Sequence, residues 1–160
     1  MKKAIALQPA HFQSLDLTPA QQVIDPILND TDAVRSLSRR DLVFSFDINF
    51  PREADDPREL SEVPEVRLWF IRLDTCYPWL PLYLDWESGE LSRYSAMLVP
   101  HQFSMDGIRY NPEALEIFVM GKVFVLEAWL QEKGIGDRSR LKFMTQMLGY
   151  ELDDALFSLL

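Results

Sequence analysis

The chain has 160 residues, a formal net charge of −9, 48% hydrophobic residues and 26% charged residues. This length predicts a single domain over residues 1–160, which would bury about 70% of the surface that the unfolded chain exposes. The acidic balance argues against nucleic acid or an anionic membrane as the main partner, because both require a basic protein surface.

The first part of the chain predicts two strands and one helix before a charged loop. Residues 3–7 are a short strand candidate, and Thr18-Pro19 starts a helix predicted over residues 18–28. Apolar and polar side chains alternate over residues 42–50, which indicates a strand with one buried and one wetter face, typical of an antiparallel sheet. The charged, proline-containing segment 51–64 is predicted to be a loop.

Three more strands are predicted between this loop and residue 100. Residues 65–73 have apolar side chains on both faces, which is typical of a central strand. Residues 80–86 and 91–99 flank Ser88-Gly89, where the glycine can supply the positive φ of a hairpin turn. Pro81 favours an edge position or a bulge for the first strand of this hairpin.

Residues 107–130 contain the clearest helix signal of the chain. Asn111 can cap a helix, Pro112 suits its first position, and Glu113 suits the positive end of its dipole. The following residues are apolar almost all the way round, which predicts a helix over residues 112–133 in the middle of the protein rather than on its surface.

One alternative stays open for this segment. A hairpin could turn at Gly121-Lys122, because β-branched and aromatic residues are frequent on either side. The length and the cap favour the helix. The helix would also carry a narrow polar stripe, made of Glu113, Glu116, Glu127 and Gln131.

Two shorter helices are predicted after Gly134-Ile135-Gly136, which ends the long helix. The first is capped by Asp137 and runs to Leu148, and the second covers residues 151–159. The order of elements predicts an α+β fold with an antiparallel sheet of about four to five strands. The helices, mostly C-terminal, would pack on one face of that sheet.

Catalytic and metal-binding motifs are not recognisable in this sequence. His11, His101 and Cys76 lack the short spacings of a metal site, so neither a metal nor another cofactor is expected, and no catalytic residue is assigned. The single cysteine also excludes an internal disulfide and suits a reducing compartment. Gly121-Lys122 lacks the remaining residues of a phosphate-binding loop.

Aromatic side chains are concentrated between residues 69 and 86, and most of them should lie in the core. Trp79 and Tyr83 lie beside prolines and are the candidates for partner binding, because interfaces favour Trp, Tyr and Arg. Arg39 and Arg40, in a local basic segment, could contribute to the same surface or pair with nearby acids.

Three segments resemble the chlororespiratory reduction 6 family of cyanobacteria and chloroplasts: LPLYLDWESGELSRYSAMLVPHQF (80–103), GIRYNPEALEIFVMGKVFVLEAWL (107–130) and SRLKFMTQMLGYELDDALF (139–157). They cover about half of the chain. The resemblance implies a non-enzymatic assembly factor for the photosynthetic NADH dehydrogenase-like complex. Such a factor acts on the peripheral arm, on the iron–sulfur subunit NdhI, and the resemblance implies no catalytic residues.

With this resemblance we expect a protein client, no nucleic acid and no membrane insertion. Glu116, Lys122 and Glu127 interrupt the most apolar stretch, which argues against a membrane-spanning helix. The first residues match neither a signal nor a transit peptide, which suggests the cytoplasm of a cyanobacterium. A client-binding protein should expose an apolar or aromatic patch and have no deep polar pocket.

Two other functions remain open. A small-molecule-binding or enzymatic α+β domain should have a pocket near His101, where His101, Asp106, Tyr110 or Asp74 converge. A structural component of an oligomer should instead have a self-complementary patch.

Overall fold

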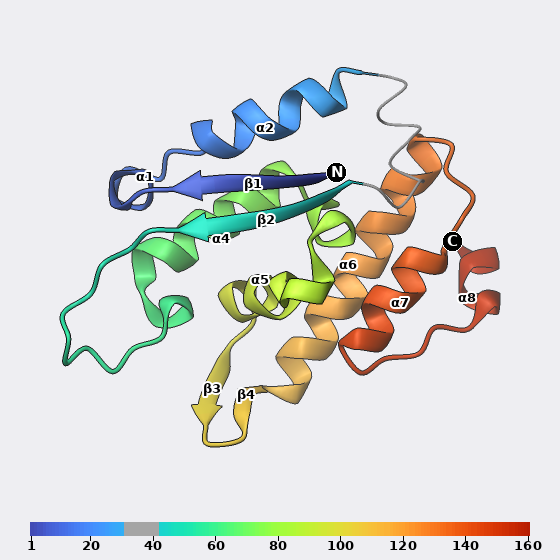
Figure 1. Cartoon of the computed structure of the whole chain (residues 1–160). Helices are drawn as coiled ribbons and strands as arrows, with labels where there is room; N and C mark the ends of the chain where they lie inside the picture. The colour runs from blue at the N-terminus through green and yellow to red at the C-terminus, as the bar shows by residue number, and fades with distance from the viewer. Residues whose placement is uncertain (31–41) are drawn as a thin grey trace.

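Strands form only two short pairs in this computed structural model, which describes residues 1–30 and 42–160 (Figure 1). β1 (Lys2–Leu7) and β2 (Val43–Ile48) pair in parallel, whereas β3 (His101–Ser104) and β4 (Gly107–Tyr110) form an antiparallel hairpin. The molecule is α+β, but the predicted antiparallel sheet of four to five strands is wrong.

Helices occur along the whole described chain rather than mainly at its C-terminal end. Three of these helices are short 3₁₀ turns, labelled η. The helices are α1 (Pro9–Gln13), α2 (Thr18–Leu28), η1 (Leu60–Glu62), α4 (Pro64–Cys76), η2 (Leu80–Tyr83), η3 (Trp86–Ser88), α5 (Glu90–Leu98), α6 (Pro112–Glu132), α7 (Ser139–Met147) and α8 (Asp154–Leu159).

The two N-terminal strands and α2 were predicted correctly from local patterns. In β2, Phe44 and Phe46 are buried and Asp47 is exposed, which confirms the predicted alternation. β1 and β2 pair with each other in parallel, whereas an antiparallel sheet was predicted. Parallel pairing requires a crossover of a dozen or more residues, and the chain between Leu7 and Val43 is long enough to provide one.

The predicted central strand at residues 65–73 is a helix, α4. Its buried side chains, Val66, Trp69, Phe70 and Leu73, recur at helical spacing, and Pro64 occupies the first turn. Because a strand and a helix can both explain an apolar run of this length, the two-faced pattern was misread. The proline at the start was the local signal that favoured a helix.

The predicted hairpin over residues 80–99 is also helical. Gly89 does have a positive φ of 82°, but it precedes α5 instead of turning a hairpin. Every side chain from Leu80 to Leu84 is buried, so the first segment has no solvent face. A segment that is buried on all sides does not show the alternation of buried and exposed side chains of a half-exposed strand. Here the segment forms the 3₁₀ turn η2 inside the core.

The predicted cap of α6 at Asn111 is confirmed, whereas the N-cap of α7 is Arg138 rather than the predicted Asp137. The Asn111 side chain accepts a hydrogen bond from the Ala114 amide at 3.1 Å, and α6 continues through Gly121, which excludes the hairpin alternative. Asp137 accepts a bond from the Ser139 amide at the start of α7. The final helix starts three residues later than predicted and is capped by Asp153.

The second edge of β2 meets an isolated bridge from Leu84 to Phe44 and side chains of α5, in place of a third strand. Arg93 Nη1 donates to the Phe46 carbonyl at 3.0 Å, and the Glu90 carboxylate accepts from the Phe46 amide. Glu90 is buried and one of its carboxylate oxygens has no partner. Burial raises the pKa of Glu90, and the nearby Arg93 offsets part of this shift.

A Glu90→Gln variant should therefore lose part of the pH dependence of stability. Because the pKa of Glu90 is raised in the folded state, its contribution is present below its ordinary pKa of 4.5 and is lost as the pH rises through the folded value. The stability of the variant relative to the wild type should rise by on the order of 1 kcal/mol between pH 4 and 7. Urea unfolding of both proteins across this range measures the difference, and parallel curves would contradict it.

Candidate interaction surface

The long helix α6 has two charged side chains on its buried side. Lys122 and Glu127 are both almost fully buried, although the remaining inward residues of the helix are aliphatic. Isolated charges are costly to bury, so each of them needs a partner of opposite charge. Both partners come from other parts of the chain.

Lys122 is paired with Asp74 at the buried side of α4. Its Nζ bonds to Asp74 Oδ1 and also donates to the Pro78 carbonyl at 3.2 Å. The Tyr94 hydroxyl of α5 donates to the same carboxylate oxygen at 2.6 Å. Burial lowers the pKa of Lys122 and raises that of Tyr94, and the charge of Asp74 raises both. This cluster joins α4, α5 and α6.

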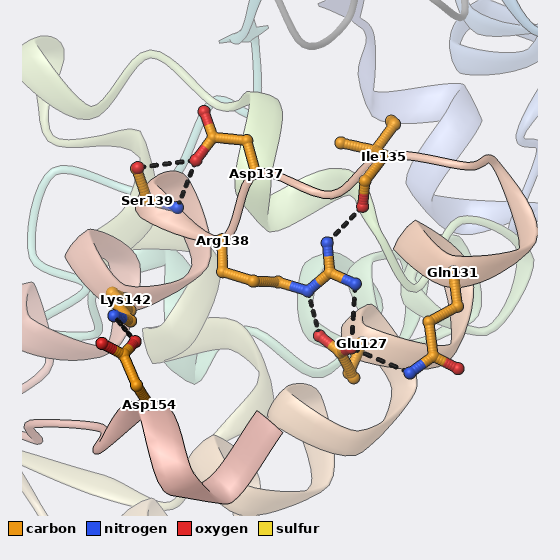
Figure 2. A network of polar contacts seen from close by, with 8 residues as sticks. All are labelled: Glu127, Gln131, Ile135, Asp137, Arg138, Ser139, Lys142 and Asp154. Carbon is orange, nitrogen blue, oxygen red and sulfur yellow. Dashed lines mark hydrogen bonds and ion pairs between the residues drawn. The ribbon is translucent and has the colours of Figure 1, made fainter. Parts of the chain in front are cut away.

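Glu127 is held by Arg138, in the segment between α6 and α7 (Figure 2). Arg138 Nε bonds to one carboxylate oxygen, and Nη2 donates to the other at 2.9 Å. The same guanidinium donates to the Ile135 carbonyl, and Gln131 donates to Glu127 at 2.9 Å. Burial raises the pKa of Glu127, but the hydrogen bonds from Arg138 and Gln131 outweigh burial and lower it.

The α7 and α8 helices are connected by a more exposed contact. Lys142 bonds to Asp154 at the start of α8, as Figure 2 shows beside the Glu127 network. Asp154 is mostly exposed to solvent, so this pair should contribute little to stability. The buried Glu127–Arg138 pair instead connects α6 to the residue that precedes α7.

The two buried ion pairs leave an apolar face of α6 in solvent. Ile117, Phe124 and Val125 are 74%, 50% and 43% exposed. Gly121 and Ala128 are exposed between and beside them, and all five residues recur at helical spacing. We call these five residues the α6 stripe. A contiguous exposed apolar face of this kind is a candidate interaction site.

The prediction that this helix is central on all sides is therefore wrong in part. Val119, Val123, Leu126 and Leu130 are buried as expected, but the opposite side is uncovered. The predicted polar stripe also differs, because Glu127 is buried against Arg138 while Glu113, Glu116 and Gln131 are exposed. Only the tertiary partners distinguish Glu127 from the other members of that stripe.

The aromatic candidates for partner binding lie in the core. Trp79 is 3% exposed and Tyr83 is 1% exposed. Trp79 stacks on Trp129 of α6 with ring centroids 5.2 Å apart, and Tyr83 packs edge-on against Trp79 at 5.6 Å. The core position is thus the correct alternative, and direct contact of these two residues with a partner stays a prediction. Arg39 and Arg40 lie outside the described residues.

The four polar candidates near His101 do not form one site. His101 and Tyr110 are neighbours across the β3–β4 hairpin, with ring centroids 6.1 Å apart. Asp106 lies exposed in the hairpin turn, and Asp74 belongs to the Lys122 cluster. His101 instead meets Ser61, a residue that sequence reasoning did not single out.

Ser61, the partner of His101, lies at the wall of an open groove. Ser61 Oγ is 2.9 Å from His101 Nε2, and His101 Nδ1 is 2.9 Å from the Val99 carbonyl oxygen. The carbonyl can only accept, so Nδ1 carries the proton and Nε2 accepts from the serine hydroxyl. Ser61 lines a groove of about 520 Å³, together with Arg52, Arg93 and Met97.

A candidate metal site is a group of three or more neighbouring His, Cys, Asp or Glu residues. Residues 1–30 and 42–160 contain no such group. Within the same residues, every helix is too short or too polar to span a membrane.

Comparison with known proteins extends the resemblance to nearly the whole chain. Residues 7–159 match the family described as chlororespiratory reduction 6. The match therefore includes the N-terminal half, which had no recognisable counterpart in the running sequence. No solved structure matches the chain significantly.

Proposed function

This chain belongs to the chlororespiratory reduction 6 family, and we propose that it is a non-enzymatic assembly factor for the photosynthetic NADH dehydrogenase-like complex. Its client would be a peripheral-arm subunit, of the NdhI iron–sulfur type, bound during maturation. The family match supports a role connected with this complex, and the surface of α6 supports binding of a protein.

The α6 stripe is the observation that carries the proposal. The helix buries charges at Lys122 and Glu127 while it exposes Ile117, Phe124 and Val125. Covering these side chains would stabilise a complex by about 25 cal/mol for each Å² of apolar surface removed from water. A client protein that covers this face only during assembly would use that stabilisation for transient binding.

Any role in maturing an iron–sulfur subunit must act through protein contacts. Iron–sulfur clusters are held by several cysteine thiolates, usually four. The chain contains one cysteine, Cys76, which is exposed at the end of α4. It cannot hold a cluster by itself, so the proposal is restricted to binding and shielding of the client.

A Phe124→Ala variant should bind the client at least about tenfold more weakly, a loss of about 1.4 kcal/mol. Phe124 is half exposed, so its removal should leave the melting temperature nearly unchanged. Phe143→Ala, on α7, is the matched control, because the same side chain is 53% exposed there. Equal losses for both variants would indicate unspecific apolar adhesion rather than a site on α6.

The test is recovery of tagged protein from its native host, with bound proteins identified by mass spectrometry. Enrichment of peripheral-arm subunits of the NADH dehydrogenase-like complex, NdhI above all, with loss of that enrichment in Phe124→Ala, would support the proposal. Recovery of the wild-type protein without any of these subunits would count against the assembly role.

A second candidate function rests on Ser61 and His101. A hydroxyl bonded to an imidazole whose other nitrogen is held in place is the arrangement of a serine nucleophile and its base. This observation favours the alternative of a small-molecule-binding or enzymatic domain near His101. A fluorophosphonate probe, which reacts with activated serines, distinguishes the two functions, since labelling of Ser61 would favour an enzyme.

A further inference from the structure

Gly121 occupies the centre of the α6 stripe, where no intramolecular contact requires a glycine. A glycine inside a helix is less stable than an alanine at the same position. Gly121 lacks the positive φ that favours glycine, and an added Cβ would meet no other atom within 4 Å. Within the described chain, alanine would therefore fit and would strengthen α6. The stripe therefore lacks a side chain at its centre, between Ile117 and Phe124.

The residues around Gly121 form holes of the kind that receive a side chain from a second helix. In knobs-into-holes packing, four residues at positions i, i+3, i+4 and i+7 surround one inserted side chain. Ile117, Met120, Gly121 and Phe124 form one such hole. A second hole follows at Gly121, Phe124, Val125 and Ala128. Both holes share Gly121, which lets another backbone approach closely.

We propose that the α6 stripe binds an apolar helix of the partner protein, with one of its large side chains inserted over Gly121. This inference rests on the proposed function, because it specifies which part of a client the stripe would hold. It adds the secondary structure of that part, its packing geometry and its charge.

The charge of the partner helix follows from the N-terminal end of the stripe. Glu113 and Glu116 are exposed there and belong to no ion pair formed between described residues. At the other end, Glu132 is already paired with Lys133 at 3.6 Å. A basic side chain on the partner would therefore gain most beside Glu113 and Glu116, and charge complementarity of this kind sets the orientation of bound helices.

A second copy of the same chain is a poorer occupant than a basic client helix. The stripe extends over 12 residues of α6, about 17 Å of helix length, so its footprint is about 170 Å². Stable dimers bury about 800 Å² on each partner. Parallel self-pairing would also bring Glu113 and Glu116 against the same glutamates of the other copy. The small area favours a transient contact, and the like charges favour a different protein over a parallel second copy.

The direct test uses two synthetic helical peptides of about 18 residues, long enough for five turns. Both have leucines at spacings of three and four residues, with lysines at the remaining positions of one peptide and glutamates in the other. Fluorescence anisotropy measures their binding to the full chain. We expect the lysine peptide to bind more tightly than the glutamate peptide.

Gly121→Ala separates binding from stability. This variant should melt at a higher temperature than the wild type, yet bind the lysine peptide about tenfold more weakly, because the added methyl fills the hole. Its net charge is unchanged, so unspecific attraction between the acidic protein and the lysines cannot explain the loss. Unchanged affinity in Gly121→Ala, or no binding of either peptide to the wild type, would overturn the proposal.

Charge reversal at the end of the stripe provides the matched comparison. Glu113→Lys should weaken binding of the lysine peptide. Glu65→Lys should not. Glu65 is also exposed and also follows the first-turn proline of a helix, α4, so its replacement has the same effect on net charge and dipole. Equal losses in both variants would overturn the orientation.

Two further outcomes keep this inference distinct from the proposed function. If sedimentation equilibrium shows a dimer that Gly121→Ala abolishes, the occupant is a second copy and the client-helix proposal fails. If the peptides bind as expected but the native pull-down contains no subunit of the NADH dehydrogenase-like complex, the helix-binding stripe stands and the proposed client is wrong.

Discussion

Replacing Asp74 with alanine is expected to destabilise the protein by about 3–5 kcal/mol. The Asp74 carboxylate accepts hydrogen bonds from Lys122 Nζ and from the Tyr94 hydroxyl, and both side chains are buried. Without Asp74, the ammonium of Lys122 would stay in the core with the Pro78 carbonyl and the Phe118 ring, neither of which carries a charge to balance it. The cost arises from the uncompensated charge more than from the lost attraction.

Urea unfolding at pH 7 measures this loss, and a double variant tests its cause. Asp74→Leu combined with Lys122→Met removes both charges, and should recover much of the stability because apolar residues of similar size replace a buried ion pair at little cost. The part that is not recovered reflects the buried Tyr94 hydroxyl, which loses Asp74 as its acceptor. Asp154→Ala is the control, since it breaks the exposed pair with Lys142 and should cost less than about 1 kcal/mol. A similarly small loss for Asp74→Ala would mean that Lys122 reaches water.

Trp79→Ala should lower the free energy of unfolding by about 3–5 kcal/mol, as expected for removal of a buried aromatic side chain. Trp79 stacks on Trp129 and contacts Tyr77 and Tyr83 edge-on, so it joins η2 to α6 at the centre of the core. Thermal and urea unfolding, compared with the exposed Phe143→Ala, measure the difference.

This result would change how binding experiments on Trp79 are interpreted. The sequence offered Trp79 and Tyr83 as candidates for partner binding, although it favoured the core for most aromatic residues of this segment. Because both are buried, their alanine variants should lose client binding through loss of the fold. A Trp79→Ala protein with wild-type stability and weakened client binding would contradict this view and would support direct contact. Binding assays of either variant therefore need an unfolding curve beside them.

The features that were predicted correctly depend on neighbouring residues in the sequence. The cap at Asn111, the proline in the first turn of α2 and the alternation over β2 were all recognisable, because capping and amphipathic patterns act over a few residues. The matched family was likewise recognisable, since three segments of the C-terminal half carried the resemblance.

The helical state of α4 and α5 could not be derived in the same way. Both segments are short and mix apolar with polar residues, and such runs occur in strands as well as in helices. Their conformation was decided by the core, where Trp69 and Phe70 of α4 pack edge-on against Phe46 of β2, while Tyr94 of α5 reaches Asp74. These contacts join residues that lie 20 or more positions apart.

The sequence alone determined that α6 is a helix with apolar residues on nearly every side. Only the tertiary structure decided which side faces solvent, because that orientation depends on Asp74 and Arg138, two partners from other segments. Burying Lys122 and Glu127 against these partners turns Ile117, Gly121 and Phe124 outward. Periodicity describes how residues are distributed around a helix, whereas long-range ion pairs and packing select the face that remains open to a partner.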